Sequence, residues 1–308
     1  MLIQKNILIL LFSIFIFSVQ SQETVDSLVI ALQKTENDTV KLHLLNQLSW
    51  EYSNKNIPVA EKYNQQALQL AEKSDCKIEL GTALHNAGMI EYYKGIRFKA
   101  LDLFFKAYEI RKKIEDKKGI ARSANMIGLL YKNQKNYDKA REYFFVCLKI
   151  RKELKDKIGI SGCYNNLGIV FKARKEYNKA LEYFLNALKI SKEINDRESM
   201  GLYLNNIGAV HHLKKDYDLA RDFYIQSKKI KEELNDLQGL VTLYTDFGNL
   251  LRETGEYEQS ESLLTSAYSI AKQINIKHEI QYVAEGLALL YKETGQFEKA
   301  YNYLALFH

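Results

Sequence analysis

Apolar residues recur along most of the chain at the spacing of amphipathic helices. Residues 164–171 place Tyr, Leu, Gly and Phe in an i, i+3, i+4, i+7 pattern, which puts them on one face of a helix. Residues 177–190 carry a wider apolar face at the same spacing, and Asn195-Asp196 then supply typical turn residues. The pattern predicts a hairpin of two helices, each about 13 to 17 residues long.

The same pattern returns every forty residues, and several residue types keep their place in it. Seven units begin near residues 41, 81, 121, 161, 201, 241 and 281, and the last of them is incomplete. The repeated positions are a glycine (Gly88, Gly128, Gly168, Gly208, Gly248), a small residue (Ala60, Ala100, Ala140, Ala180, Ala220, Ser260, Ala300) and an acidic turn residue (Asp116, Asp156, Asp196, Asp236). A fixed period of this length is typical of a solenoid of stacked helix pairs.

Stacking accounts for the small residues. Two short helices are marginal alone, because nucleation is costly and each apolar stripe would face water. Glycine inside a helix costs up to about 1 kcal/mol relative to alanine, so its return needs a geometric reason. We expect close backbone contact at Gly168 and Ala180. The predicted fold is all-α, a solenoid of antiparallel helix pairs over residues 39–308, with a capping helix within residues 22–38.

These repeated residues resemble the tetratricopeptide repeat, whose pattern runs aromatic or Leu, Leu, Gly, Tyr, Ala, Phe, Ala. The third unit offers Ala124, Ile127, Gly128, Tyr131, Ala140, Phe144 and Cys147, and the fourth offers Tyr164, Leu167, Gly168, Phe171, Ala180, Phe184 and Ala187. The units differ from the usual 34-residue repeat in their length and in the missing closing proline. The resemblance implies a right-handed superhelical solenoid whose first helices line the inner curve.

The longer unit is similar to the variant found in kinesin light chains, cell-polarity adaptors and bacterial peptide-sensing regulators. It is most similar to the extracytoplasmic sensor regions of membrane histidine kinases and DNA-binding regulators in Bacteroidetes-type bacteria. The resemblance implies protein or peptide recognition in the periplasmic sensor region of a signal-transduction protein. The alternatives are a free-standing exported adaptor, a cytoplasmic peptide-sensing regulator, and the N-terminal part of a membrane histidine kinase whose catalytic module lies beyond His308.

A second stripe on the predicted first helices is the candidate ligand-binding groove, and we expect it to face solvent. Its members are the asparagines Asn125, Asn165 and Asn205, the basic residues Lys132, Lys172, His212 and Arg252, and Met89 and Tyr92, which would hold an apolar anchor of the ligand. Asparagine amides both donate to and accept from a peptide backbone, and the cations can pair with carboxylates. The stripe therefore predicts a groove for a peptide or an acidic protein segment. The alternative is an ordinary solvated helix face.

The first 21 residues predict export. Lys5 precedes an apolar run from Ile7 to Phe17, and Val19 and Ser21 are compact residues at the expected cleavage site. The run is shorter than the roughly twenty apolar residues of a membrane-spanning helix, so we expect cleavage after Ser21 rather than a retained anchor. The expected location is the periplasm or the extracytoplasmic side of a membrane. Contact with a membrane is expected only through an uncleaved anchor or a segment after His308.

Composition and motifs argue against catalysis and nucleic-acid binding. The chain has 308 residues, one proline and a net charge of +6, and its basic runs are followed closely by acidic residues. His211 and His212 are neighbours on a helix and point about 100° apart, so they do not form a metal site. We expect His211 to pack like the aromatic residues of other units. The three cysteines include no CxxC pair and read as packing residues. We expect no cofactor, no metal and no catalytic centre.

Overall fold

A computed structural model describes residues 25–305, and this range consists of helices joined by short turns. After a helix at 25–34, seven helix pairs follow. The first helices of the pairs are α2 (Asp38–Tyr52), α4 (Lys77–Tyr93), α6 (Lys117–Asn133), α8 (Lys157–Ala173), α10 (Arg197–Leu213), α12 (Leu237–Glu253) and α14 (Lys277–Glu293). The second helices are α3 (Ile57–Lys73), α5 (Arg97–Lys113), α7 (Tyr137–Glu153), α9 (Tyr177–Glu193), α11 (Tyr217–Leu234), α13 (Tyr257–Ile274) and α15 (Phe297–Leu304).

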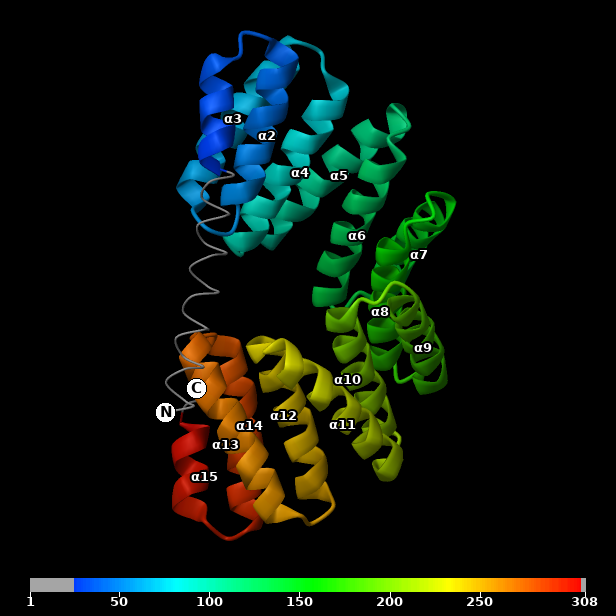
Figure 1. The fold of residues 1–308 in the computed structure, drawn as a ribbon, viewed down its shortest axis with the longest axis vertical. Coiled ribbons are helices and arrows are strands. Elements are labelled where there is room, and N and C mark those ends of the chain that lie inside the picture. The colour runs from blue at the N-terminus through cyan, green and yellow to red at the C-terminus, as the bar shows by residue number, and fades with distance from the viewer. Residues whose placement is uncertain (1–24, 306–308) are drawn as a thin grey trace. The chain divides into compact units, whose positions relative to one another are not determined.

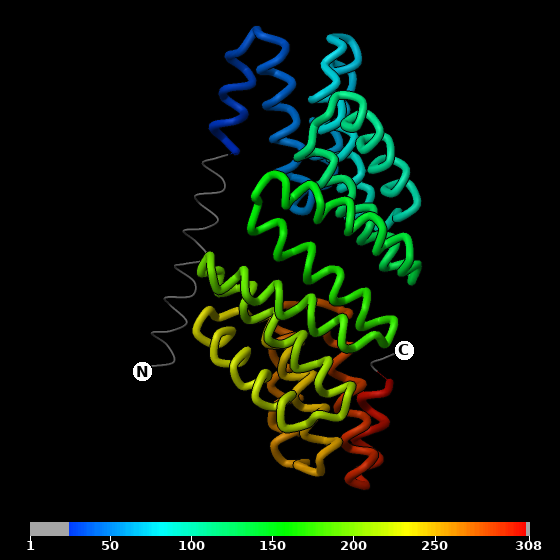
Figure 2. The backbone as a smooth tube through the Cα atoms, turned by 90° about the vertical axis from the view of Figure 1, so that its right-hand side faces the viewer, coloured from blue at the N-terminus to red at the C-terminus, as the bar shows by residue number. Residues whose placement is uncertain are grey.

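The pairs form two compact units, one ending at Ile150 and the other beginning at Arg151, within α7. In the first unit, α2 and α3, then α4 and α5, form antiparallel pairs (Figure 1). In the second unit, the chain from α8 onward turns back at the end of each helix (Figure 2). Within each unit the first helices of neighbouring pairs contact one another, whereas the second helices α3 and α5, or α9, α11 and α13, do not. The first helices therefore lie on the tighter, inner side of each unit.

The repeated glycines make room for a side chain of the second helix sixteen residues later. A Cβ atom added to Gly128 would lie 2.7 Å from the ring of Phe144, and one added to Gly168 would lie 2.6 Å from the ring of Phe184. The rings themselves are fully buried. The prediction that glycine allows close approach is confirmed, but the closest atoms belong to an aromatic ring rather than to the partner backbone. In these two pairs a ring is thus inserted against a bare helix backbone, whereas the side chain that packs against Gly248 is that of Leu264.

The acidic turn residues begin the first helices. The carboxylate of Asp196 accepts a hydrogen bond from the backbone N–H of Ser199 at 3.1 Å, and Asp116 accepts one from Gly119 at 2.9 Å. Such N-caps satisfy a backbone donor that has no partner inside the helix. Asn195, just before the cap, has a positive φ of 54°, which asparagine tolerates well. The repeated turn is therefore specified by local hydrogen-bond chemistry.

Two predicted segments, the capping helix and the signal peptide, lie near the N-terminal end of the chain. The helix at 25–34 lies within the expected capping segment, and its Leu32 packs against the buried cluster of Leu42 and Leu45. The predicted signal peptide, residues 1–21, lies outside the described residues, as do residues 306–308. Across residues 25–305, none of the helices combines the length and the apolar character needed to cross a bilayer.

Candidate functional site

The asparagines of the predicted groove lie at the contacts between successive first helices. Asn165 is 8% exposed and accepts a hydrogen bond at 2.8 Å from the side-chain amide of Asn206. Asn205 is 4% exposed and donates to the carboxylate of Asp246 at 3.0 Å. The expectation that these asparagines face solvent is wrong, because their position points toward the next first helix. Asn125 is half-buried in α6. That any of them binds a ligand stays a prediction.

Three of the predicted basic residues meet at one cavity of about 360 Å³, the second-unit cavity. Lys172, His212 and Arg252 line it. His212 Nε2 lies 3.0 Å from the carboxylate of Glu253, and Arg252 pairs with Glu293 as well as with Glu253. The phenol of Tyr282 donates to Asp246 at 2.6 Å in the same cavity. Glutamates of the chain itself already partner His212 and Arg252, and ligand binding by these cations stays a prediction.

The remaining predicted residues lie in the first unit. Met89 is buried in a cluster with Phe104 and Ile127, so the expectation that it faces solvent is wrong, and its contact with an apolar group of a ligand stays a prediction. The reason is the same inward contact between neighbouring helices. Tyr92 is half-buried and meets Tyr93 edge to face, with ring centroids 5.7 Å apart. Lys132 is half-buried near the end of α6.

His211 and the cysteines follow their predictions. The His211 ring stacks on Phe223 with an interplanar angle of 5°, as Phe171 stacks on Tyr183 at 8°. Cys147 and Cys163 are buried at packing positions. Among residues 25–305, no group of three His, Cys, Asp or Glu side chains is arranged to hold a metal ion.

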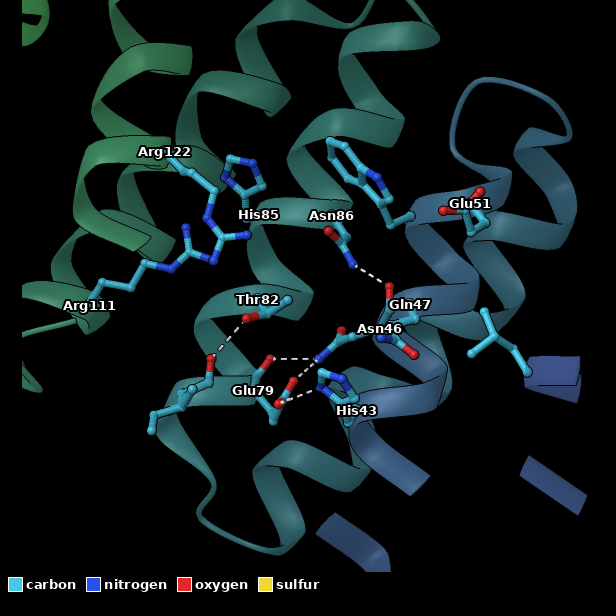
Figure 3. Close-up of a pocket in the computed structure, with 13 residues that line it drawn as sticks. His43, Asn46, Gln47, Glu51, Glu79, Thr82, His85, Asn86, Arg111 and Arg122 are labelled. Carbon is cyan, nitrogen blue, oxygen red and sulfur yellow. Dashed lines mark hydrogen bonds and ion pairs between the residues drawn. The ribbon is translucent and has the colours of Figure 1, made fainter. Parts of the chain in front are cut away.

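The largest cavity among those described is in the first unit, and none of the residues that line it is among the predicted groove residues. This first-unit cavity measures about 560 Å³. It is lined from α2, α4, α5, α6 and the helix at 25–34 by Leu28, His43, Asn46, Gln47, Trp50, Glu51, Ile78, Glu79, Thr82, His85, Asn86, Arg111 and Arg122. Figure 3 shows Glu51 and the α2 side chains on one side, and Arg111, Arg122 and His85 on the other.

The acidic side of the first-unit cavity is internally paired. Glu79 accepts a hydrogen bond from the Asn46 side-chain amide at 2.7 Å, and its other oxygen lies 3.3 Å from His43 Nδ1 (Figure 3). Glu51 forms an ion pair with Lys55 at 3.3 Å. These carboxylates therefore already have partners within the first unit.

The basic side contains a fully buried arginine. Arg111 is 0% exposed, and its Nη1 donates to the hydroxyl of Ser123 at 2.8 Å and to the carbonyl of Gly119 at 3.2 Å. Its Nε and Nη2 atoms are buried without a hydrogen-bond partner. The nearest carboxylate oxygen, of Asp116, is 3.7 Å from Nε, which is beyond hydrogen-bond distance. Half of this guanidinium is thus held in place and half is unsatisfied.

The surroundings of Arg111 shift its own pKa and the pKa of His85. Burial lowers the pKa of Arg111 to about 10; Arg122 adds to this shift and Asp116 opposes it. The guanidinium therefore remains charged at neutral pH. Burial, followed by the charges of Arg111 and Arg122, also holds the pKa of His85 well below its ordinary value of 6.5. The His85 Nδ1 atom is buried without a hydrogen-bond partner.

A regular exchange of residue sizes explains how α5 accommodates this arginine. A Cβ atom added to Gly119 would lie 2.5 Å from Arg111 Cδ, so the glycine gives the arginine its space. The corresponding pairs along the chain are Ala71 with Glu79, Arg111 with Gly119, Arg151 with Gly159, Ser191 with Ser199, Lys231 with Gly239, and Ala271 with Glu279. In these pairs a long basic residue always accompanies glycine, alanine accompanies glutamate, and the remaining pair consists of two serines. This exchange is the sequence signal that would have located Arg111.

The stacked helix pairs and their lined inner surfaces define a helical repeat scaffold suited to binding proteins or peptides. The tetratricopeptide repeat profile matches residues 79–153, 159–233 and 199–273, which together cover more than half of the chain. The chain belongs to the tetratricopeptide repeat family. No curated protein matches it in sequence.

Solved structures show the same fold at low sequence identity. The apo form of RapI superposes with a TM-score of 0.74 at 17% identity, covering 87% of this chain and 96% of RapI. The Rap conjugation gene regulator of plasmid pLS20, solved with the Phr* peptide, has a TM-score of 0.63 at 16% identity over 93% of this chain and 83% of its own. A signal transduction ATPase with a tetratricopeptide repeat sensor from Pyrococcus horikoshii has a TM-score of 0.69 at 20% identity, over 88% of this chain and 43% of its own.

Proposed function

We propose that this protein recognises a peptide or protein segment that carries carboxylates, and that it does so on the inner surface formed by its first helices. The observation that carries this proposal is the first-unit cavity, whose two acidic side chains are paired while its two arginines have no hydrogen-bonded carboxylate. The partly exposed Trp50 and Ile78 on the same cavity add apolar contact area. The combination suits a ligand with both charged and apolar groups.

The fold supports a peptide ligand in particular. The pLS20 regulator, which shares the fold, was solved with a bound peptide. Extended peptides gain affinity on such surfaces from a few buried contacts, with the surrounding residues supplying complementarity. We infer that the ligand here is an extended segment that lies along several first helices of one unit.

We further propose that the protein works outside the cytoplasm, as the sensor or interaction region of a signal-transduction protein. The predicted signal peptide supports export, and the ATPase with a repeat sensor provides a precedent for this fold in signalling. A free-standing exported adaptor is the second candidate. N-terminal sequencing of the protein from the native cell should find a chain beginning at Gln22 in the periplasmic or membrane fraction. An intact N-terminus in the cytoplasmic fraction would contradict export.

Binding itself is tested with an array of random peptides, each paired with a copy in which Asp and Glu are replaced by Asn and Gln. We expect the acidic copies to bind more strongly. The double variant Lys132→Glu, Lys172→Glu should weaken their binding by about tenfold, because each unit loses one inner basic residue.

The control for this variant is Lys149→Glu, Lys189→Glu. It makes the same change in net charge, one residue in each unit, on exposed positions of the second helices α7 and α9. Equal weakening by both variants, or equal binding of the acidic and neutral copies, would contradict the proposal.

A further inference from the structure

The first-unit cavity contains an unsatisfied guanidinium edge. Arg111 Nη1 is committed to Ser123 and Gly119, which fixes the orientation of the guanidinium plane. The Nε and Nη2 atoms, both without a hydrogen-bond partner, lie on one edge of that plane. Two parallel N–H donors on one edge match the two oxygens of a carboxylate. A buried donor left unsatisfied carries a free-energy cost, so a bound carboxylate would relieve it.

A second cation lies beside this edge. Arg122 is exposed, and among residues 25–305 it has no ion pair or hydrogen bond. Arg111 and Arg122 extend toward each other and toward His85 (Figure 3), and each arginine lowers the pKa of His85. Two like charges that share one cavity repel each other, and an anion between them removes that repulsion. Because Arg122 is exposed and unpaired, its side chain is free to turn as an anion enters.

Among the described residues, Arg111 is the only basic side chain in this register with two buried nitrogen atoms that lack a hydrogen bond. Forty residues after Arg111, Arg151 contacts the cap residue Asp156 directly. Eighty residues further on, Lys231 is likewise paired, with its Nζ 2.8 Å from Asp236. In the first unit, the corresponding distance from Arg111 to Asp116 is 3.7 Å. The same register therefore holds a close ion pair at Arg151 and at Lys231, whereas the longer Arg111–Asp116 ion pair leaves the buried Nε and Nη2 atoms of Arg111 without a hydrogen bond.

We propose that Arg111 and Arg122 bind the carboxylate of a peptide residue whose apolar side chain contacts Trp50 and Ile78. Both apolar residues line the cavity and are exposed, Trp50 by 48%. This inference rests on the proposed function for its ligand class, but it concerns one site and one chemical group. Arg111 supplies the paired donors, and Arg122 supplies the second charge.

The chain contains a built-in reporter for this site. Trp50 is its only tryptophan, so intrinsic tryptophan fluorescence reports on the first-unit cavity. The probe is N-acetyl-leucine, which carries one carboxylate and one apolar side chain. The matched controls are N-acetyl-leucinamide, which lacks the charge, and inorganic phosphate, which lacks the apolar group. We expect a saturable change in Trp50 fluorescence with N-acetyl-leucine alone.

Two variants test the assignment to the arginines. Arg122→Gln should weaken N-acetyl-leucine binding by about tenfold, and the exposed Arg97→Gln, outside the cavity, should leave it unchanged. Arg111→Lys keeps the charge but removes the paired donor edge, and it should also weaken binding. If circular dichroism shows that Arg111→Lys does not fold, Arg122→Gln still decides the question. No saturable change, equal binding of the amide, stronger binding of phosphate, or unchanged affinity in Arg122→Gln would overturn the site.

The outcome for the site is separable from the outcome for the proposed function. If peptides selected by the array bind Arg122→Gln as tightly as the original protein, the site is overturned and the proposed function stands. If N-acetyl-leucine binds in an arginine-dependent way while no peptide on the array binds, the site stands and the proposed function is overturned.

Discussion

The two cavities are built on equivalent first helices but differ in how their charges are satisfied. In the second-unit cavity, Arg252 and His212 contact glutamates of the chain itself. In the first-unit cavity, the glutamates are paired with other residues, and Arg111 keeps two donors without partners. The difference arises at positions that the repeat leaves variable. A repeated scaffold can therefore carry an arginine in contact with two glutamates in one place and an arginine without a hydrogen-bonded carboxylate in another.

In the interior, by contrast, the two units pack their helix pairs in the same way. Gly128 faces Phe144 in the first unit as Gly168 faces Phe184 in the second. Constancy in the interior keeps neighbouring pairs in register, and the variable inner positions then decide what each unit binds. Substitutions can test the constant interior and the variable inner positions separately.

The largest expected effect is on the shared interior. Gly128→Leu and Gly168→Leu each force a side chain into a position already filled by a buried ring. Overpacking of this kind costs about 3 kcal/mol, and we expect similar losses in the free energy of unfolding for the two variants. Urea denaturation followed by circular dichroism measures the loss, and Trp50 fluorescence follows the first unit separately.

The control is Lys189→Leu, an exposed position on α9. It adds the same side chain without entering the interior, so its effect should stay within about 0.5 kcal/mol. If Gly168→Leu and Lys189→Leu have the same denaturation midpoint, the glycine is not a packing requirement.

The next effect concerns the exchange of sizes at Arg111 and Gly119. Gly119→Glu should cost about 2 kcal/mol, because its Cβ would collide with the Arg111 stem and with Asp116. Adding Arg111→Ala recreates the pairing of Ala71 with Glu79. The double variant should recover at least about 1 kcal/mol of the free energy of unfolding, while losing N-acetyl-leucine binding.

A double-mutant cycle by urea denaturation provides the measurement. The recovery has a structural basis, since Asn86 stands forty residues after Asn46, the residue that donates to Glu79. Strictly additive effects of the two substitutions would show that the exchange along the chain has no energetic coupling.

The sequence was enough to predict the helix pairs, their period and the turns, because these depend on local spacing and on capping residues such as Asp196. It also predicted the stacking of His211. It did not predict the burial of Asn165 and Met89, because helical spacing identifies a face but not the distance to the next helix. Arg111 was missed because a buried arginine looks like a surface residue in sequence, and only the paired change at Gly119 marks it.

A smaller effect separates the arginines of the two cavities. Arg252 is 11% exposed in its side chain and contacts Glu293 and Glu253, so Arg252→Ala should lower the free energy of unfolding by about 1 to 2 kcal/mol. Arg122→Ala removes an exposed, unpaired side chain and should change it by less than about 0.5 kcal/mol. Urea denaturation of both variants makes the comparison. Equal losses would mean that the two cavities do not differ in charge pairing.

The smallest expected effect is the pH dependence contributed by His85. Its pKa is held below 6.5 in the folded protein, chiefly by burial, so the unfolded chain binds the proton more readily. Stability from this group is therefore present above pH 6.5 and is lost as the pH falls through that value toward the lowered folded pKa. One proton sets a limit of about 1.4 kcal/mol per pH unit on the slope.

Urea denaturation followed by Trp50 fluorescence from pH 7.5 to about pH 5 should show this slope, and His85→Phe should reduce it. His278→Gln, at an exposed histidine of the second unit, is the control and should leave the slope unchanged. The same slope in His85→Phe as in the original protein would show that His85 is not the buried neutral group on the basic side of the first-unit cavity.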